Sequence, residues 1–166
     1  SQDLELTFDI RLALQSLAIE KAIPFITPAQ EARLEELLKI LAECMNKEDG
    51  RKLHDKANHE FHQTLIEASG NKRLLDMYES LNAHIQIARL HAEQTDWRAR
   101  LHAEPKEHEE MLAALLRKDT RAAVSATRRH IEGAKKALMT QLQGQATQGQ
   151  VTESPPSGAN EPAGNS

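Results

Sequence analysis

The sequence predicts an all-α fold, on the strength of three observations. Aromatic residues make up only 3% of the 166 residues, whereas the strands of a sandwich or barrel need β-branched and aromatic side chains. Apolar residues recur at three- and four-residue spacing over most of the chain, with no competing strand-like alternation. The connections between these segments are short, which favours antiparallel neighbours in a helical bundle. The length fits one domain with a buried core.

Clear start and stop signals delimit the first three helices. Pro24 ends the first, because proline cannot donate the next backbone hydrogen bond. Thr27 is an N-cap candidate, and Pro28 occupies the first position of the second helix. Asp49 and Gly50 separate the second helix from the third. These helices are expected over residues 3–22, 28–46 and 51–68.

Three further helices follow a tight restart. Gly70 is available for a left-handed position at the end of the third helix. Pro105 opens the fifth helix, and Asp119 caps the sixth. The later helices are expected over residues 72–93, 105–118 and 120–142, with residues 95–104 irregular or briefly helical.

The last residues differ in composition from the rest. Residues 144–166 are rich in Gln, Gly, Pro, Ser, Thr and Asn and nearly lack apolar side chains. Such a segment buries too little surface to offset the entropy of ordering it. The sequence therefore predicts a helical domain over residues 1–143 and a disordered tail over residues 144–166.

Charge and cysteine content narrow the function classes. Lys and Arg number 21 against 25 Asp and Glu, a net charge of −4, so no sequence-wide basic field recruits nucleic acid. The single Cys44 cannot form an intramolecular disulfide, and a free thiol suits a reducing cytoplasm. No apolar run approaches the roughly 18 residues of a membrane span. We expect a cytoplasmic protein without a membrane partner.

Helical spacing sorts the eight histidines. Three of them, on three separate helices, lie in line with apolar residues and are predicted to face inward: His62, His108 and His130. His59 and His102 lie among charged residues and are predicted to face solvent. The others lie at the margins of the apolar stripes, and spacing does not assign them: His54, His84 and His91.

Three inward imidazoles need partners. An unsatisfied polar group in a core costs roughly 1–3 kcal/mol, and a divalent metal ion would satisfy all three rings together. Asn58 lies four residues before His62 on the same helical face, so its amide oxygen is a candidate fourth ligand, weaker than a carboxylate. The alternative is that each histidine is a core residue satisfied by neighbouring protein groups.

Two arginines lie in largely apolar surroundings. Arg11 lies among Phe8, Leu12 and Leu14, and Arg89 is close to Ile85. A buried guanidinium needs an anion, which is either internal or a ligand. Alternatively, both side chains extend along their aliphatic stems to solvent.

Several segments together resemble the FCD fold, the ligand-sensing C-terminal domain of the fatty-acid-regulator branch of GntR-type transcription factors. The resemblance covers about residues 5–140. It rests on the following segments, in order: Asp9-Ile-Arg11-Leu-Ala-Leu-Gln15 for "E-x-R-x-x-L-E", Asn58-His-Glu-Phe61-His62 for "D-x-x-F-H", Ala68-Ser-Gly-Asn71 with Leu74 for "A-S-G-N-x-x-L", Glu107-His108 with Leu112 and Ala114 for "E-H-x-x-I-L-x-A", and Lys118-Asp119 with Ala123 and Arg129-His130-Ile131 for "G-D-x-x-x-A-x-x-x-M-x-x-H-I".

The resemblance implies an antiparallel bundle of six to seven helices enclosing a ligand and metal pocket. In the metal-binding branch an aspartate and three histidines hold a divalent ion, and the matching residues are Asn58, His62, His108 and His130. Asn58 replaces the commoner aspartate and removes one negative charge. Zinc or nickel is expected before manganese or iron. Arg11 would receive the carboxylate of a small organic acid, with Arg89 as a second effector-binding candidate.

The function implied is that of the effector-sensing domain of a transcription regulator, acting as a homodimer. The N-terminal winged helix-turn-helix domain, through which such regulators bind DNA, is absent from this chain, and the apolar pattern is already under way at Leu4. One alternative is a metal-dependent helical-bundle enzyme, but its general base is missing: spacing places Glu60 away from the face of His62. Another is a helical interaction domain with metal-free histidines.

Overall fold

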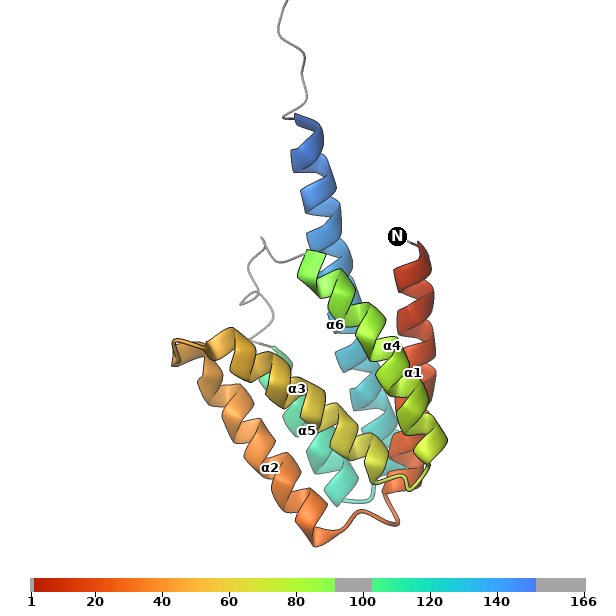
Figure 1. Cartoon of the computed structure of the whole chain (residues 1–166). Helices are drawn as coiled ribbons and strands as arrows, with labels where there is room; N and C mark the ends of the chain where they lie inside the picture. Colours follow the sequence, from red (N-terminus) through yellow and green to blue (C-terminus); the bar gives the residue numbers. More distant parts are fainter. Residues whose placement is uncertain (1, 92–102, 152–166) are drawn as a thin grey trace, which may run out of the picture.

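The computed structural model describes residues 2–91 and 103–151, and these residues form a bundle of helices (Figure 1). The predicted all-α fold is confirmed. In chain order the elements are α1 (Gln2–Ala22), α2 (Pro28–Glu43), the short 3₁₀ turn η1 (Cys44–Asn46), α3 (Gly50–Glu67), α4 (Lys72–His91), α5 (Glu104–Leu116) and α6 (Thr120–Val151).

The helices pack in two groups that share α6. α2 packs on α3 and α5, whereas α1 packs on α3, α4 and α6, and α5 also lies against α6. In Figure 1, α2, α3 and α5 lie on one side of the bundle and α1 and α4 on the other. This arrangement brings α1, α3, α5 and α6 together along the middle of the molecule.

Three apolar clusters form the core of the part of the chain that the structure describes. The largest joins α1, α2, α3, α5 and α6 around Leu37, Phe61 and Met111. A second lies between α1, α4 and α6 around Phe8 and Ile131, and a third between α1, α3 and α4 around Tyr78. None of the three includes the inward histidines, which form a separate buried polar group in the same interior.

The helix ends follow the predicted signals with small differences. Thr27 and Gln30 form a capping box at the start of α2, and Gly70 adopts the left-handed conformation with φ of 67°. α2 ends at Glu43, and residues 44–46 tighten into a 3₁₀ turn instead of continuing the α-helix. Residues 95–102 of the predicted irregular segment lie outside the described residues.

α6 is longer than the sequence pattern predicts. The helix continues past residue 142 to Val151, so residues 144–151 belong to α6 and not to the predicted disordered tail. Glycine at these positions disfavours a helix, whereas glutamine supports one. Neither residue removes a backbone donor, as proline would. Residues 152–166 of the predicted tail lie outside the described part of the chain.

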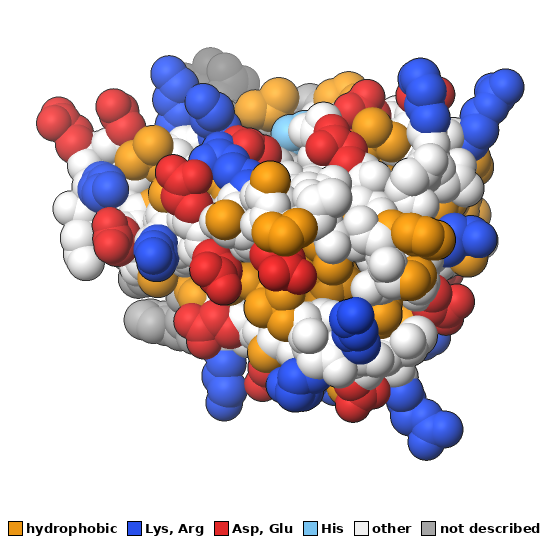
Figure 2. Space-filling model, turned by 90° about the horizontal axis from the view of Figure 1, so that it is seen from below, with side chains coloured by type: hydrophobic (Ala, Val, Ile, Leu, Met, Phe, Trp, Pro, Cys, Tyr) orange, Lys and Arg blue, Asp and Glu red, His pale blue; other side chains and the backbone are white. Residues whose placement is uncertain are grey.

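On the face seen from below, acidic and basic side chains are not segregated into separate patches. Acidic and basic side chains alternate there with patches of apolar side chains between them (Figure 2). This face therefore offers no continuous basic surface to a nucleic acid. Among the described residues, no helix is long and apolar enough to cross a membrane.

Lys118 explains why α5 stops at Leu116. Its φ is 58°, the left-handed region that glycine adopts without steric cost. The amide of Asp119 donates to the carbonyl of Ala114 at 3.0 Å and closes the helix end. The FCD motif has glycine at the position of Lys118, and the backbone geometry supplies the reason.

Lys118→Gly should therefore stabilise the protein, by about 1 kcal/mol, because it removes the steric cost of a Cβ in this conformation. Gly70→Ala is the matched variant in the opposite direction: a Cβ there meets open space, so only backbone strain acts. Chemical denaturation of both variants measures the changes. A less stable Lys118→Gly variant would contradict this account of the helix end.

Candidate metal centre

The three histidines predicted to face inward meet in the interior. His62 on α3, His108 on α5 and His130 on α6 are each at most 2% exposed. Nε2 of His62 lies 3.1 Å from Nε2 of His130 and 3.4 Å from Nε2 of His108. One ligand atom from each ring lies within 4.8 Å of the others, so the group could hold a metal ion. Periodicity predicted the burial, and helix packing brings the rings together.

The distances between the rings suit direct ligation. Imidazole nitrogens bind zinc at about 2.0–2.1 Å, which places neighbouring ligand atoms of a tetrahedral site about 3.3 Å apart. The Nε2 separations of His62 from His130 and from His108 lie close to this value. Two of the three ring pairs therefore have the spacing of neighbouring ligands on a divalent cation of this size, and the third lies within 4.8 Å.

Asn58 has an unsatisfied oxygen near the same face of α3. Its side chain is 4% exposed, and Oδ1 is buried without a hydrogen-bond partner. Leaving a buried acceptor unpaired costs roughly 1–3 kcal/mol, and such groups usually have an unseen partner such as an ion or water. Asn58 lies one turn before His62, so the orphaned oxygen is compatible with a fourth ligand.

Two further side chains hold the histidine rings from outside. Oε2 of Glu107 lies 2.9 Å from Nδ1 of His130, and Nε2 of Gln15 on α1 lies 2.7 Å from Nδ1 of His62. A carboxylate on Nδ1 is the usual partner of a metal-binding histidine, since it orients the ring and leaves Nε2 for the ion. Phe61 packs edge-on against both His62 and His108 and supplies an apolar wall.

Electrostatics keep two of the rings neutral. Burial, and then the positive charge of Arg11, hold the pKa of His62 well below its usual range. Burial and the neighbouring His130 lower the pKa of His108 in the same direction. Metal ions bind the unprotonated imidazole, so the lowered pKa values keep both rings in the neutral charge state that metal binding requires at neutral pH.

The structure distinguishes between the two arginines. Arg11 is buried, and its guanidinium lies 5.9 Å from the ring centre of Phe8 and 5.8 Å from that of Tyr78. The solvent-exposed alternative is therefore wrong for Arg11. Arg89 is half-buried on α4, and its charge contributes to lowering the pKa of His62. Both cations thus act on the histidine group.

The predicted solvent position of His59 is only partly right. The ring is half-buried, lies 2.9 Å from Nδ2 of Asn82 and stacks on Tyr78 with centroids 6.4 Å apart. α4 covers this side of α3, a contact that the spacing on α3 alone does not reveal. His102 lies outside the described residues.

Comparisons with known proteins address the fold. The family model for the FCD domain matches residues 6–133. The structure is similar to that of E. coli McbR/YncC, with a TM-score of 0.79 and 23% identity, over 85% of this chain and 70% of that one. It is also similar to the "Metal-free FCD domain of TM0439 a putative transcriptional regulator", with a TM-score of 0.69 and 20% identity, over 85% and 94%. No curated protein matches the chain.

Sequence reasoning missed a buried ion pair beside the histidine group. Nε2 of His54 on α3 lies 3.2 Å from Oε1 of Glu104 on α5, and both side chains are largely buried. Burial alone lowers the pKa of His54, but the contacts with Asp55 and Glu104 outweigh it and raise that pKa to about 9. The same contact holds the pKa of Glu104 below its usual range despite burial. The pair fixes the first turn of α5 to α3.

The His54 pair should make stability depend on pH in the alkaline range. Because the pKa rises from 6.5 to about 9 on folding, the contribution is complete below pH 6.5 and lost as pH rises through about 9. The shift corresponds to about 3 kcal/mol. Urea denaturation across this range should show that loss in the wild type and not in His54→Gln. His84→Gln, which changes an exposed histidine on α4, should keep the wild-type slope.

Proposed function

The chain belongs to the FCD domain family, and we propose that it is the effector-sensing domain of a GntR-type transcription regulator that binds a divalent metal ion and a small organic acid. The observation that supports this most is the convergence of three buried imidazoles, together with an orphaned amide oxygen on Asn58, one helical turn before His62. In this proposal Asn58, His62, His108 and His130 hold the metal, with zinc or nickel favoured over manganese or iron. The bound ion would supply a Lewis-acidic position for an effector carboxylate.

Arg11 and Arg89 are the proposed cationic partners of that carboxylate. Arg11 is positioned by α1 and by the aromatic faces of Phe8 and Tyr78. A guanidinium offers paired donors that match the two oxygens of a carboxylate. Arg89 contributes a second positive charge within electrostatic range of His62. An organic acid would therefore meet cationic groups and a metal within one interior.

The positions of the proposed binding residues on different helices support the sensing role. The proposed metal ligands lie on α3, α5 and α6, and Arg11 lies on α1, so bound ligands would tie four helices together. An effector changes the activity of a regulator only if it binds one conformational state better than another. DNA binding would belong to a separate winged helix-turn-helix domain, in a cytoplasmic regulator.

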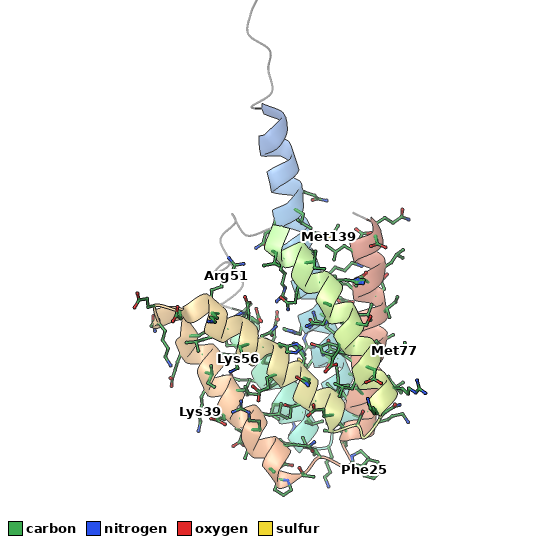
Figure 3. All side chains as sticks on the ribbon, viewed as in Figure 1. Phe25, Lys39, Arg51, Lys56, Met77 and Met139 are labelled. Carbon is green, nitrogen blue, oxygen red and sulfur yellow. The ribbon has the colours of Figure 1, made fainter. Side chains whose placement is uncertain are left out.

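A homodimer is the proposed assembly. Leu6, Ile10 and Leu17 lie exposed along the outer face of α1, opposite its buried face, and Met77 projects outward from the neighbouring α4 (Figure 3). A contiguous exposed apolar patch is a candidate interaction site, and the side chains of Leu6, Ile10 and Leu17 lie on one face of α1. A second copy of the chain is the partner that we propose for this face.

The enzyme alternative is less well supported. A hydrolytic metal site needs a general base, and the candidate carboxylates each have a partner already. Glu60 pairs with Arg33 on α2, Glu104 pairs with His54, and Glu107 lies against His130. Sensing accounts for the same residues without requiring one of these contacts to break.

The metal proposal predicts about one divalent ion per chain after mild purification. Elemental analysis should show it in the wild type and in His84→Ala, whose changed residue is exposed, and should show its loss in His108→Ala. Asn58→Asp should bind zinc roughly tenfold more tightly in competition with a chelator, because a carboxylate replaces a neutral oxygen. Equal metal content in wild type and His108→Ala would place the ion at other residues, and absence of metal from the wild type would favour the metal-free interaction domain.

The effector proposal predicts a loss of affinity in Arg11→Lys. A thermal-shift screen of small organic acids identifies the acid that stabilises the wild type most, and calorimetry measures its affinity. Lysine keeps the charge but loses the paired donors, so the affinity should fall roughly ten- to hundredfold. Arg33→Lys, on the outer side of α2, is the matched control. Unchanged affinity in Arg11→Lys would remove Arg11 from the effector site.

A further inference from the structure

The hydrogen bond between Arg11 and Gln15 fixes the orientation of a buried amide. Nε of Arg11 lies 2.9 Å from one end of the Gln15 amide. A guanidinium has donors only, so the atom facing it must be the oxygen, Oε1. The other end of the amide is then Nε2, a donor only, and it lies 2.7 Å from Nδ1 of His62. Nδ1 of His62 must therefore accept this hydrogen bond.

This direction decides where His62 carries its proton. An imidazole whose Nδ1 accepts a hydrogen bond carries its proton on Nε2. Nε2 is the atom that faces Nε2 of His130 at 3.1 Å and Nε2 of His108 at 3.4 Å. The proton of His62 thus points toward the point at which a metal ion would sit.

The rest of the network agrees with this direction. Nδ1 of His130 lies 2.9 Å from Oε2 of Glu107, and a carboxylate accepts, so His130 carries its proton on Nδ1. Its Nε2 then has a free lone pair to accept from His62. The donors run in one direction, from Arg11 through Gln15 and His62 to His130 and Glu107. Every hydrogen bond along this path has a donor and an acceptor.

The contacts of Glu107 with His130 and of Gln15 with His62 therefore have opposite effects on metal binding. Glu107 holds His130 with its Nε2 lone pair directed inward, as a metal ligand requires. Gln15 holds His62 with a proton on the corresponding atom. Metal binding at Nε2 of His62 requires that proton to move to Nδ1 of the same ring, which stays neutral. Nδ1–H would then face the amide N–H of Gln15, donor against donor.

We propose that Gln15, oriented by Arg11, is a positioning residue that opposes metal binding at the histidines and makes it depend on which way its amide faces. The proposal rests on the proposed metal function. Turning the amide by half a turn presents Oε1 to the Nδ1–H of His62 and frees Nε2 of that ring for the ion. The turned amide no longer accepts from Nε of Arg11.

The same geometry couples the two proposed ligands. A carboxylate that draws the guanidinium of Arg11 away from Oε1 removes the contact that fixes the amide. Gln15 can then turn, and the tautomer of His62 that binds metal becomes favourable. Carboxylate and metal should therefore bind with positive cooperativity, and the coupling must be the same in both directions.

The decisive variant is Gln15→Glu, which replaces the donor facing His62 with an acceptor. Gln63→Glu is the matched control, because it makes the same change next to His62 in the chain, on the side chain that contacts Glu67 and Glu79. Long-range ¹H–¹⁵N correlation spectra of the metal-free full chain report which ring nitrogen of His62 carries the proton. Competition between Zn²⁺ and a chromophoric chelator reports the affinity.

We expect His62 to carry its proton on Nε2 in the wild type and in Gln63→Glu, and on Nδ1 in Gln15→Glu. Zn²⁺ should bind Gln15→Glu roughly ten- to hundredfold more tightly than the wild type, and Gln63→Glu within a few-fold of it. A proton on Nδ1 of His62 in the wild type overturns the proposal and needs no variant to be seen. Equal Zn²⁺ affinity in Gln15→Glu and Gln63→Glu overturns it as well.

The measurements separate this proposal from the function on which it rests. If the tautomers are as expected but Zn²⁺ binds no variant, the metal function fails and the influence of Gln15 on a metal fails with it. If Zn²⁺ binds the wild type through the histidines but the tautomer does not respond to Gln15→Glu, the metal function stands and the role of Gln15 is refuted.

Discussion

The interior of this bundle is organised by the need to satisfy three imidazoles that have been removed from water. Each ring has one donor and one acceptor, and an apolar core supplies neither. Polar side chains from separate helices reach two of the outer nitrogens: Gln15 from α1 contacts Nδ1 of His62, and Glu107 from α5 contacts Nδ1 of His130. Nδ1 of His108 is buried without a hydrogen-bond partner, and Nε2 of His62 faces Nε2 of both other rings. The apolar clusters pack around this group and so fix which helices can meet there.

Helical periodicity predicted the helices and the inward faces of His62, His108 and His130, because burial along one helix follows from its own sequence. Contacts between helices depend on how each helix is rotated against its neighbours, and one sequence does not reveal this. Gln15 lay in a recognised motif without an assigned role, and the partner of His54 lies fifty residues further along the chain. His59 was placed in solvent because the covering helix belongs to a different part of the sequence.

The sequence predicted a helix end reliably where a single residue determines the local backbone conformation. It predicted the end poorly where the helix propensities of several residues decide together. The capping box at Thr27 and the left-handed Gly70 were predictable because each follows from local chemistry. The end of α6 was not, since a run of glutamine, threonine and glycine neither favours nor blocks another turn. Lys118 shows the opposite case: a residue poorly suited to its conformation is held there by the packing of α5 against α6.

The length of α6 makes the position of its far end sensitive to the tilt of the helix near the histidines. At about 1.5 Å per residue, its 32 residues span about 48 Å, and Figure 1 shows the helix projecting well past its neighbours. His130 lies about a third of the way along, so about 30 Å of rigid rod extends beyond it. Tilting this rod by one degree about His130 displaces its far end by about half an ångström. A rotation near the imidazole too small to disturb the packing of the bundle would thus grow along α6 into a displacement of its far end.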